Sequence, residues 1–244
     1  MKIKALLALL LLLAPLAVHA APTPREILEI SDRARGKVPG LVWTVKMTDK
    51  NAEGEKAQTL EVKARNADAL ASFLDPPRVK GQKLLIVGRN MWFIKPGVSK
   101  AVPISPRQRL MGQAANGDIA STNYAADYEG TLSGEEACGN DSCYVLDLKA
   151  AAQNLTYDRI VYWVSKTKGY GVRADFYTVS GKKFKSALFE YGNTITLEGK
   201  KIPFVSRMTI EDALRPAEKT VLEYSGITVR TLPDSAFDLN LLLK

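Results

Sequence analysis

Residues 171–191, GVRADFYTVSGKKFKSALFEY, form the stretch that decides the fold. Gly171–Val179 and Lys183–Tyr191 are rich in β-branched and aromatic residues, and Ser180-Gly181-Lys182 between them is typical of a tight turn. The other candidate strands of the second half are Tyr157–Ser165, Lys201–Glu211 and Thr220–Arg230. Strands in sequence joined by short turns predict an antiparallel sheet, because parallel strands need long crossover connections.

The first half of the chain has the same alternation with a few helical signals. A short helix is expected at Arg25–Arg35, and strands are expected around Leu41–Met47 and Leu60–Ala64. Further predicted elements are a helix Ala67–Leu74 capped by Asn66, a hairpin of Lys83–Val87 and Met91–Ile94, a short helix from Ser105 through Gln108, Leu110 and Met111, and a long loop, Gln113–Ala126. These elements amount to about ten or eleven strands and about three short helices in a mainly β protein.

The first twenty residues predict a cleavable secretory signal peptide. Met1-Lys2-Ile3-Lys4 is a cationic start, an apolar run follows, and Val18-His19-Ala20 supplies small residues where a signal peptidase cleaves. No later stretch is apolar enough to span a bilayer. We therefore expect residues 1–20 to be removed, a single domain over residues 21–244, and a periplasmic location of the Gram-negative type.

The loss of this segment limits the chemistry of the mature protein. His19 is the single histidine of the chain, so its removal excludes histidine-dependent triads and histidine-ligated zinc. Of the 34 basic residues, Lys2 and Lys4 leave with the signal, which gives 32 basic against 26 acidic residues and a net charge of +6. This modest, dispersed excess does not indicate nucleic-acid binding. The sequence predicts no enzyme activity, no catalytic residues, no cofactor and no metal.

The two cysteines predict a disulfide. Cys138 and Cys143 enclose four turn-forming residues between two strand-like segments, and an exported protein meets an oxidising environment. Redox motifs favour two intervening residues at a helix start, and the mature chain has no other cysteine or histidine to complete a metal site. The pair is therefore interpreted as a structural staple across a hairpin.

A large antiparallel sheet curls because its strands twist, and its concave face must be filled, covered or left hollow. The predicted short helices offer little apolar surface to fill it. We therefore expect an apolar ligand pocket, with candidate lining residues Trp43, Val45, Leu60, Leu84, Ile86, Trp92, Ile94, Leu110, Met111, Phe176, Phe204, Met208 and Leu222. Residue by residue, an ordinary core is the favoured alternative; the pocket is an expectation about the sheet as a whole, and both stay open here.

Several segments together resemble the LolA-like family, which is named for outer-membrane lipoprotein sorting. The resemblance rests on Tyr128–Leu132, Arg109-Leu110-Met111-Gly112, Tyr157–Val164 and Asp175–Lys182, in this family's order and spacing, and extends from about Leu41 to Phe237. It implies a strongly curved, incomplete antiparallel barrel closed by helices, which holds a lipid or an acylated lipoprotein. It also implies a periplasmic carrier, and for some members a partnership with an inner-membrane transporter.

Two further expectations concern partners. The alternative to a carrier is a sensor or accessory protein that uses the same fold to bind another protein. A filled interior favours this alternative and an open cavity favours the carrier. Basic turns at Lys182, Lys183, Lys185, Lys200 and Lys201 are predicted either to be solvated surface or to make transient contact with an anionic membrane surface.

Overall fold

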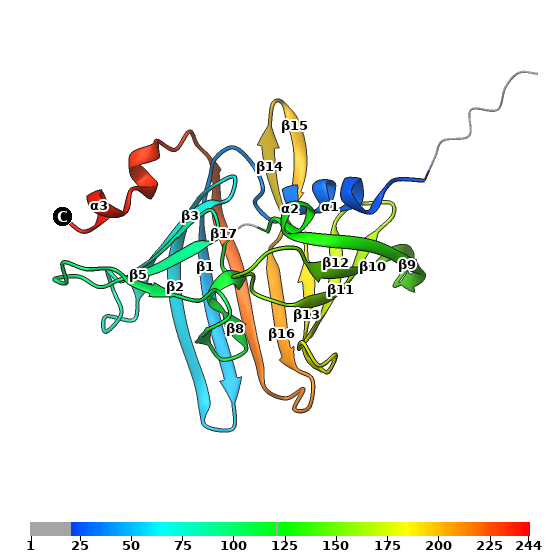
Figure 1. The fold of residues 1–244 in the computed structure, drawn as a ribbon, viewed down its shortest axis with the longest axis horizontal. Helices are drawn as coiled ribbons and strands as arrows, with labels where there is room; N and C mark the ends of the chain where they lie inside the picture. The colour runs from blue at the N-terminus through cyan, green and yellow to red at the C-terminus, as the bar shows by residue number, and fades with distance from the viewer. Residues whose placement is uncertain (1–20, 121) are drawn as a thin grey trace, which may run out of the picture.

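One large antiparallel sheet dominates the protein (Figure 1). The computed structural model describes residues 21–120 and 122–244, so the predicted signal peptide and His19 lie outside the described residues. Thirteen strands follow the order β6-β5-β4-β3-β2-β1-β17-β16-β13-β12-β11-β10-β9. The sheet is curved and does not close into a barrel: β6 and β9 are its two edges. The mainly β, half-barrel fold expected from the sequence is confirmed.

The chain builds this sheet almost entirely from neighbouring hairpins, and the pairing of β1 with β17 joins its two halves. The strands of the main sheet are β1 (Leu41–Asn51), β2 (Gly54–Arg65), β3 (Asp68–Asp75), β4 (Lys83–Val87), β5 (Asn90–Ile94), β6 (Val102–Ile104), β9 (Tyr128–Cys138), β10 (Asp141–Ala150), β11 (Arg159–Ser165), β12 (Gly171–Tyr177), β13 (Lys183–Glu190), β16 (Arg207–Asp212) and β17 (Lys219–Val229). Two small hairpins stand apart from it: β7 (Arg109–Met111) with β8 (Ala114–Ala115), and β14 (Asn193–Leu197) with β15 (Lys200–Phe204).

Three sequence predictions are wrong in detail. The segment predicted as the helix Ala67–Leu74 is strand β3 from Asp68 onward, and Ala67 lies with Asn66, whose φ is 55°, in the β2–β3 turn. Side chains on both faces of β3 are buried, so its continuous apolar run imitates a helix. The predicted helix through Gln108, Leu110 and Met111 is a turn followed by β7. The predicted strand Lys201–Glu211 is split into β15 and β16. Pro203 has no backbone N–H to donate. It lies in the β14–β15 hairpin, outside the main sheet, where a missing hydrogen-bond donor costs little.

The two faces of the sheet carry different cores. On the concave face, strand pairing aligns Trp43 with Val62, Val62 with Ala71, and Ala71 with Leu84. This alignment continues through β17, β16 and β13 to form the main core. On the convex face, Leu70 and Leu85 join a smaller cluster beneath the C-terminal elements η2 (Asp234–Phe237) and α3 (Leu239–Leu242).

Short elements cover part of the concave face. Helix α1 (Pro24–Arg33) begins at a Thr23 capping box completed by Glu26 and buries Ile27 and Leu28 in the main core. The other covering elements are the turn η1 (Asn116–Asp118) and the single-turn helix α2 (Tyr124–Asp127). Helix α2 contacts both α1 and β9. None of the helices in the described part of the chain is long and apolar enough to cross a membrane.

The predicted disulfide is present. Cys138 and Cys143 are bonded across the β9–β10 hairpin, with their Cα atoms 5.9 Å apart. Cys143 is fully buried on the convex side beside Val145 and Trp163. The bond therefore staples the tip of the last hairpin, beside the β9 edge of the sheet.

Candidate functional site

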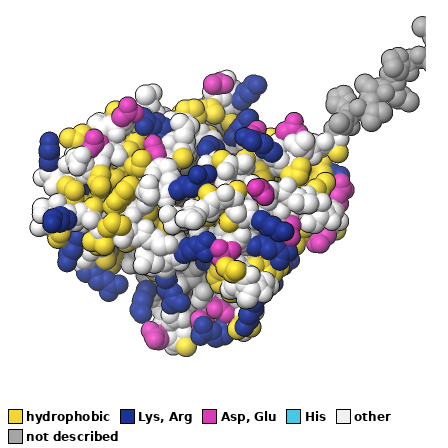
Figure 2. Space-filling model, viewed as in Figure 1, with side chains coloured by type: hydrophobic (Ala, Val, Ile, Leu, Met, Phe, Trp, Pro, Cys, Tyr) yellow, Lys and Arg dark blue, Asp and Glu magenta, His cyan; other side chains and the backbone are white. Residues whose placement is uncertain are grey.

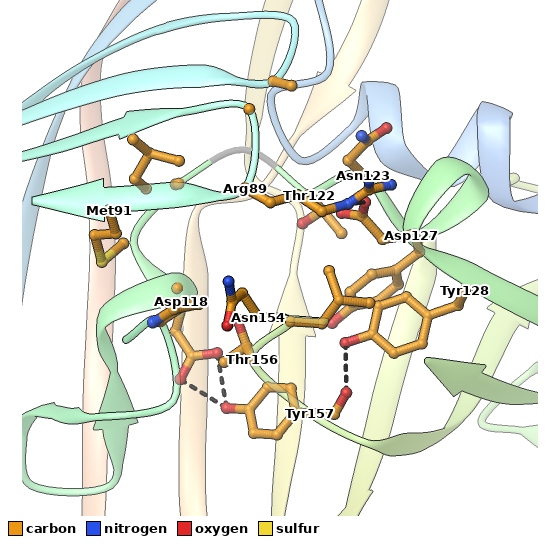
Figure 3. A pocket seen from close by; sticks show the side chains of 18 of the residues that line it. Arg89, Met91, Asp118, Thr122, Asn123, Asp127, Tyr128, Asn154, Thr156 and Tyr157 are labelled. Carbon is orange, nitrogen blue, oxygen red and sulfur yellow. Dashed lines mark hydrogen bonds and ion pairs between the residues drawn. The ribbon is translucent and has the colours of Figure 1, made fainter. Parts of the chain in front are cut away.

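A pocket lies where the two ends of the curved sheet approach each other (Figure 3). One wall comes from β4, β5 and the turn between them, and the other from α2, the start of β9 and the segment before β11. The pocket volume is about 110 Å³. Its described lining residues are Arg35, Ala67, Ile86, Gly88, Arg89, Met91, Pro106, Gly117, Asp118, Ala120, Thr122, Asn123, Tyr124, Asp127, Tyr128, Asn154, Leu155, Thr156 and Tyr157.

Two ion pairs connect the ends of the sheet across this mouth. The Arg89 Nε atom lies 3.0 Å from Asp127 Oδ1, and Arg107 Nη2 lies 2.7 Å from Asp158 Oδ1. Both arginine side chains are more than 40% exposed, so each pair contributes at most about 1 kcal/mol. The two ends are therefore held together by contacts that are easily broken.

A buried network around Asp118 forms the floor of the pocket. The Tyr157 hydroxyl donates to Asp118 at 2.8 Å (Figure 3). The Ala115 amide donates to Asp118 Oδ2 at 2.8 Å. The Lys185 ammonium lies 3.5 Å from the same carboxylate and donates to the Gln113 carbonyl at 2.8 Å. Burial lowers the pKa of Lys185, whereas burial and the neighbouring Asp118 raise the pKa of Tyr157. This network holds η1 and the preceding loop against β13.

Gly112 fits the same loop closely against the sheet. Its φ is 52°, and a β-carbon here would collide with Asp49 and Thr220. The Thr220 hydroxyl accepts from the Gln113 amide at 2.7 Å and donates to Asp49 at 2.8 Å. Only glycine combines this left-handed backbone with so close an approach.

Asp32 connects the two helices that cover the mouth. Its Oδ2 accepts a hydrogen bond from the Ala125 amide of α2 at 3.0 Å, while Oδ1 has no partner among the described residues. Burial raises the pKa of Asp32 to about 7, although the amides of Ala125 and Tyr124 and the charges of Arg35 and Lys37 oppose this shift. A second tie runs from the Lys37 ammonium to the Asn123 side chain at 2.6 Å.

Arg35 lies just after α1 and is only 7% exposed. Its guanidinium carbon is 4.3 Å from the centroid of the Phe189 ring and 5.8 Å from that of Tyr124. Nη2 contacts the Met208 sulfur at 3.8 Å, and Nη1 has no hydrogen-bond partner among the described residues. The site thus combines apolar walls, acids with partners, the paired ammonium of Lys185 and the buried guanidinium of Arg35, which suits it to binding.

Comparison with known proteins identifies the family. A LolA superfamily protein from Nitrosomonas europaea has a solved structure that is similar over 89% of this chain and 98% of its own, with 32% sequence identity and a TM-score of 0.80. The chain belongs to the LolA superfamily. A family model described only as an uncharacterized protein also matches residues 65–244.

More distant structures share the fold of this LolA superfamily chain. A putative outer membrane lipoprotein-sorting protein domain from Vibrio parahaemolyticus is 21% identical, with a TM-score of 0.76 over 91% of this chain and 98% of its own. A DUF1329 family protein from Desulfovibrio piger is 22% identical, with a TM-score of 0.74 over 88% of this chain and 95% of its own. No protein with curated annotation matches the sequence.

Most of the predicted pocket residues lie in the main core of the LolA-like sheet. Nine of them are buried on the concave side: Trp43, Val45, Leu60, Leu84, Met111, Phe176, Phe204, Met208 and Leu222. Leu110 and Ile86 are half-buried against the same core. Of the whole predicted set, Ile86 alone lines the pocket in the described structure.

Two predicted positions require correction. Trp92 and Ile94 do not face the concave side. They belong to the convex cluster with Leu85, Leu232 and Phe237. Trp92 pairs with Leu85, whereas the neighbouring Phe93 pairs with Leu84, so the alternation of β5 was assigned one residue out of step.

The five predicted surface lysines do not form one patch. Lys185 is 5% exposed and paired with Asp118, so it is unavailable to a membrane surface. Lys182 and Lys183 lie at the turn before β13, whereas Lys200 and Lys201 lie on the β14–β15 hairpin, which follows the other end of β13. Figure 2 likewise shows Lys and Arg side chains spread over the visible face.

Sequence reasoning missed the residues that give the pocket its polar character. Arg35, Asp118 and Tyr157 come from three segments far apart in the chain, and no local motif links them. Asp118 lies in the stretch predicted to be a loop, and Tyr157 lies at the start of a segment that resembles the family. Only the fold brings them together.

Proposed function

We propose that this protein is a periplasmic carrier that binds the apolar part of a lipid or an acylated lipoprotein, without a chemical step. The observation that supports this most strongly is the curved sheet, whose concave face is lined by apolar side chains and covered only by short elements. LolA superfamily membership agrees with it, and the similar Vibrio parahaemolyticus domain is described as lipoprotein-sorting.

Loading requires the covering elements to move. Ligand pockets commonly enclose about 300–1,000 Å³, and the pocket at the mouth has only about 110 Å³. An empty apolar cavity exposed to water is unfavourable, so an unloaded carrier is expected to be closed. The covering elements are held by few contacts. These are two exposed ion pairs and the Asp32–Ala125 and Lys37–Asn123 hydrogen bonds, and α2 is only one turn long.

Solvent extraction tests the carrier proposal. Protein purified under mild conditions is extracted with organic solvent and analysed by mass spectrometry, and a second sample is titrated with a fluorescent fatty acid. We expect near-stoichiometric lipid in the extract, or saturable binding of the probe to protein that was stripped of lipid. Repeated absence of both overturns the proposal.

The alternative is an accessory or sensor protein that binds another protein. The observation that favours it is the filled interior, since the predicted cavity residues are mostly packed in the core. This function predicts a stable protein partner and no saturable lipid binding. The titration described above therefore separates the two functions.

Location and delivery belong to the same proposal. The predicted signal peptide supports export to the periplasm, and a carrier there needs a donor and an acceptor for its lipid. An inner-membrane transporter is the proposed partner of this kind. Transient membrane contact through Lys182 and Lys183 or through Lys200 and Lys201 remains part of this proposal as two separate surfaces.

A further inference from the structure

Arg35 is a buried cation whose bonding is incomplete. The guanidinium is packed between the Phe189 and Tyr124 rings and the Met208 sulfur, and Nη1 has no hydrogen-bond partner among the described residues. An arginine keeps its charge in a protein and offers five donors in a rigid fork. A buried positive charge without a paired anion is unfavourable, so we expect such a group to bind an anion supplied by a ligand.

The surroundings of Arg35 supply no full countercharge. Asp32 acts on Arg35 only at a distance, because the two form no ion pair, and burial raises the pKa of Asp32 to about 7. The tyrosines near the guanidinium are neutral at physiological pH, and burial raises the pKa of each further above its ordinary value; they are Tyr124, Tyr162, Tyr191 and Tyr224. The Tyr191 hydroxyl is also buried without a hydrogen-bond partner in the described structure.

Among the charged residues that line the pocket, Arg35 is the one without a partner of opposite charge in the described structure. The lining residues that carry charge are Arg35, Arg89, Asp118 and Asp127. Arg89 pairs with Asp127, and Asp118 is satisfied by Lys185, Tyr157 and a backbone amide. Each acid of the pocket thus has a basic partner: the four charged lining residues sum to zero, and Lys185 beside them brings the total to one positive charge.

We propose that Arg35 binds the acidic group, a carboxylate or a phosphate, of an amphiphile whose hydrocarbon part occupies the concave side of the sheet. This inference rests on the carrier function proposed above and adds the class of ligand. The pocket is too small for a lipid but lies beside apolar side chains of Ile86, Met91 and Leu155, so an anionic group there can continue into an apolar chain. An anion accepting from Nη1 completes the bonding of the guanidinium.

Matched ligands test this assignment. Purified full-length protein is titrated by calorimetry with laurate, with dodecanol, which has the same chain without the charge, and with inorganic phosphate. We expect laurate to bind about tenfold or more tightly than dodecanol, as one charge-assisted hydrogen bond in a desolvated site predicts. We expect no measurable binding of phosphate alone, because it lacks the chain.

Three variants locate the effect. Arg35→Met removes the charge and is expected to bind laurate and dodecanol equally, whereas Arg35→Lys is expected to recover part of the preference. Arg207→Met is the control, since it removes an exposed arginine that pairs with Glu223 outside the pocket, and it is expected to keep the wild-type preference for laurate. Circular-dichroism melting confirms folding of each variant, and the wild-type comparison decides the matter if Arg35→Met does not fold.

Each contrary outcome has a distinct meaning. Equal binding of laurate and dodecanol to the wild type, or an unchanged preference in Arg35→Met, overturns the role of Arg35 but leaves the carrier function standing. Tight binding of phosphate alone shows a free-anion site and overturns the amphiphile. Absence of binding for both chain compounds overturns the carrier function and this inference together.

Discussion

Replacing Asp32 with asparagine is expected to change how the stability of the protein depends on pH. The folded-state pKa of Asp32 is raised to about 7 from 3.8, chiefly because the carboxyl is fully buried between α1 and α2. Between these two pH values the folded protein therefore binds more protons than the unfolded chain. Its free energy of unfolding must fall as pH rises through this window and level off above about pH 7.

The size of this effect follows from the shift. Three pKa units correspond to about 4 kcal/mol at about 1.4 kcal/mol each, of which about 3 kcal/mol falls between pH 5 and pH 8. Asp32→Asn removes the titrating group and keeps an acceptor for the Ala125 amide. The difference in unfolding free energy, wild type minus variant, is therefore expected to fall by about 3 kcal/mol from pH 5 to pH 8.

Urea denaturation of both proteins at half-unit pH intervals measures this difference, and other titrating groups cancel in the comparison. Glu29→Gln, on the exposed side of the same helix, is the control and is expected to stay within about 0.5 kcal/mol of the wild type throughout. A difference between wild type and Asp32→Asn that is constant, or that grows with pH, refutes the reasoning about the buried carboxyl.

Three further outcomes are expected. Ile86→Trp should weaken binding of a fluorescent fatty acid at least about tenfold by filling the pocket. Val87→Trp, on the opposite face of β4, is the control and should not weaken it. Equal affinities of the two variants for the fatty acid would contradict the placement of the binding site at Ile86. Gly112→Ala should lower the free energy of unfolding, measured by urea titration, by more than about 1 kcal/mol. Gly181→Ala is the control and should cost less, because Gly181 also has positive φ but has open space where a β-carbon would lie. A smaller loss at Gly112 than at Gly181 would show that the loop can move to accommodate the β-carbon. Replacing Cys138 and Cys143 with serine should cost about 2 kcal/mol, the value for so short a loop, and a calorimetric loss near zero would argue against the staple.

The architecture could be predicted from the sequence because it is determined by local sequence patterns. Alternating apolar residues and glycine-containing turns specify antiparallel hairpins, and the β11–β13 region was placed to within about two residues at each end on that basis. Errors occurred where the pattern is ambiguous. β3 is buried on both faces and imitates a helix, and β5 has apolar residues at successive positions, so the face of Trp92 could not be chosen before its pairing was known.

The candidate site was far less predictable. The pocket is assembled from residues near 35, 89, 118 and 157, which are distant in sequence and meet only because the sheet curves back toward itself. The polar residues among them have ordinary local surroundings. Their special property, burial of Arg35 without a paired anion and of Asp118 with Lys185, exists only in the folded molecule.

The most direct test of a lipid-carrying half-barrel is a crystal structure of the protein saturated with laurate. Electron density for the chain is expected between the concave face and the covering elements α1, η1 and α2, with those elements displaced and the carboxylate at Arg35. A chain bound on the convex face, or a saturated protein whose cover and core are unchanged and hold no chain, would contradict it.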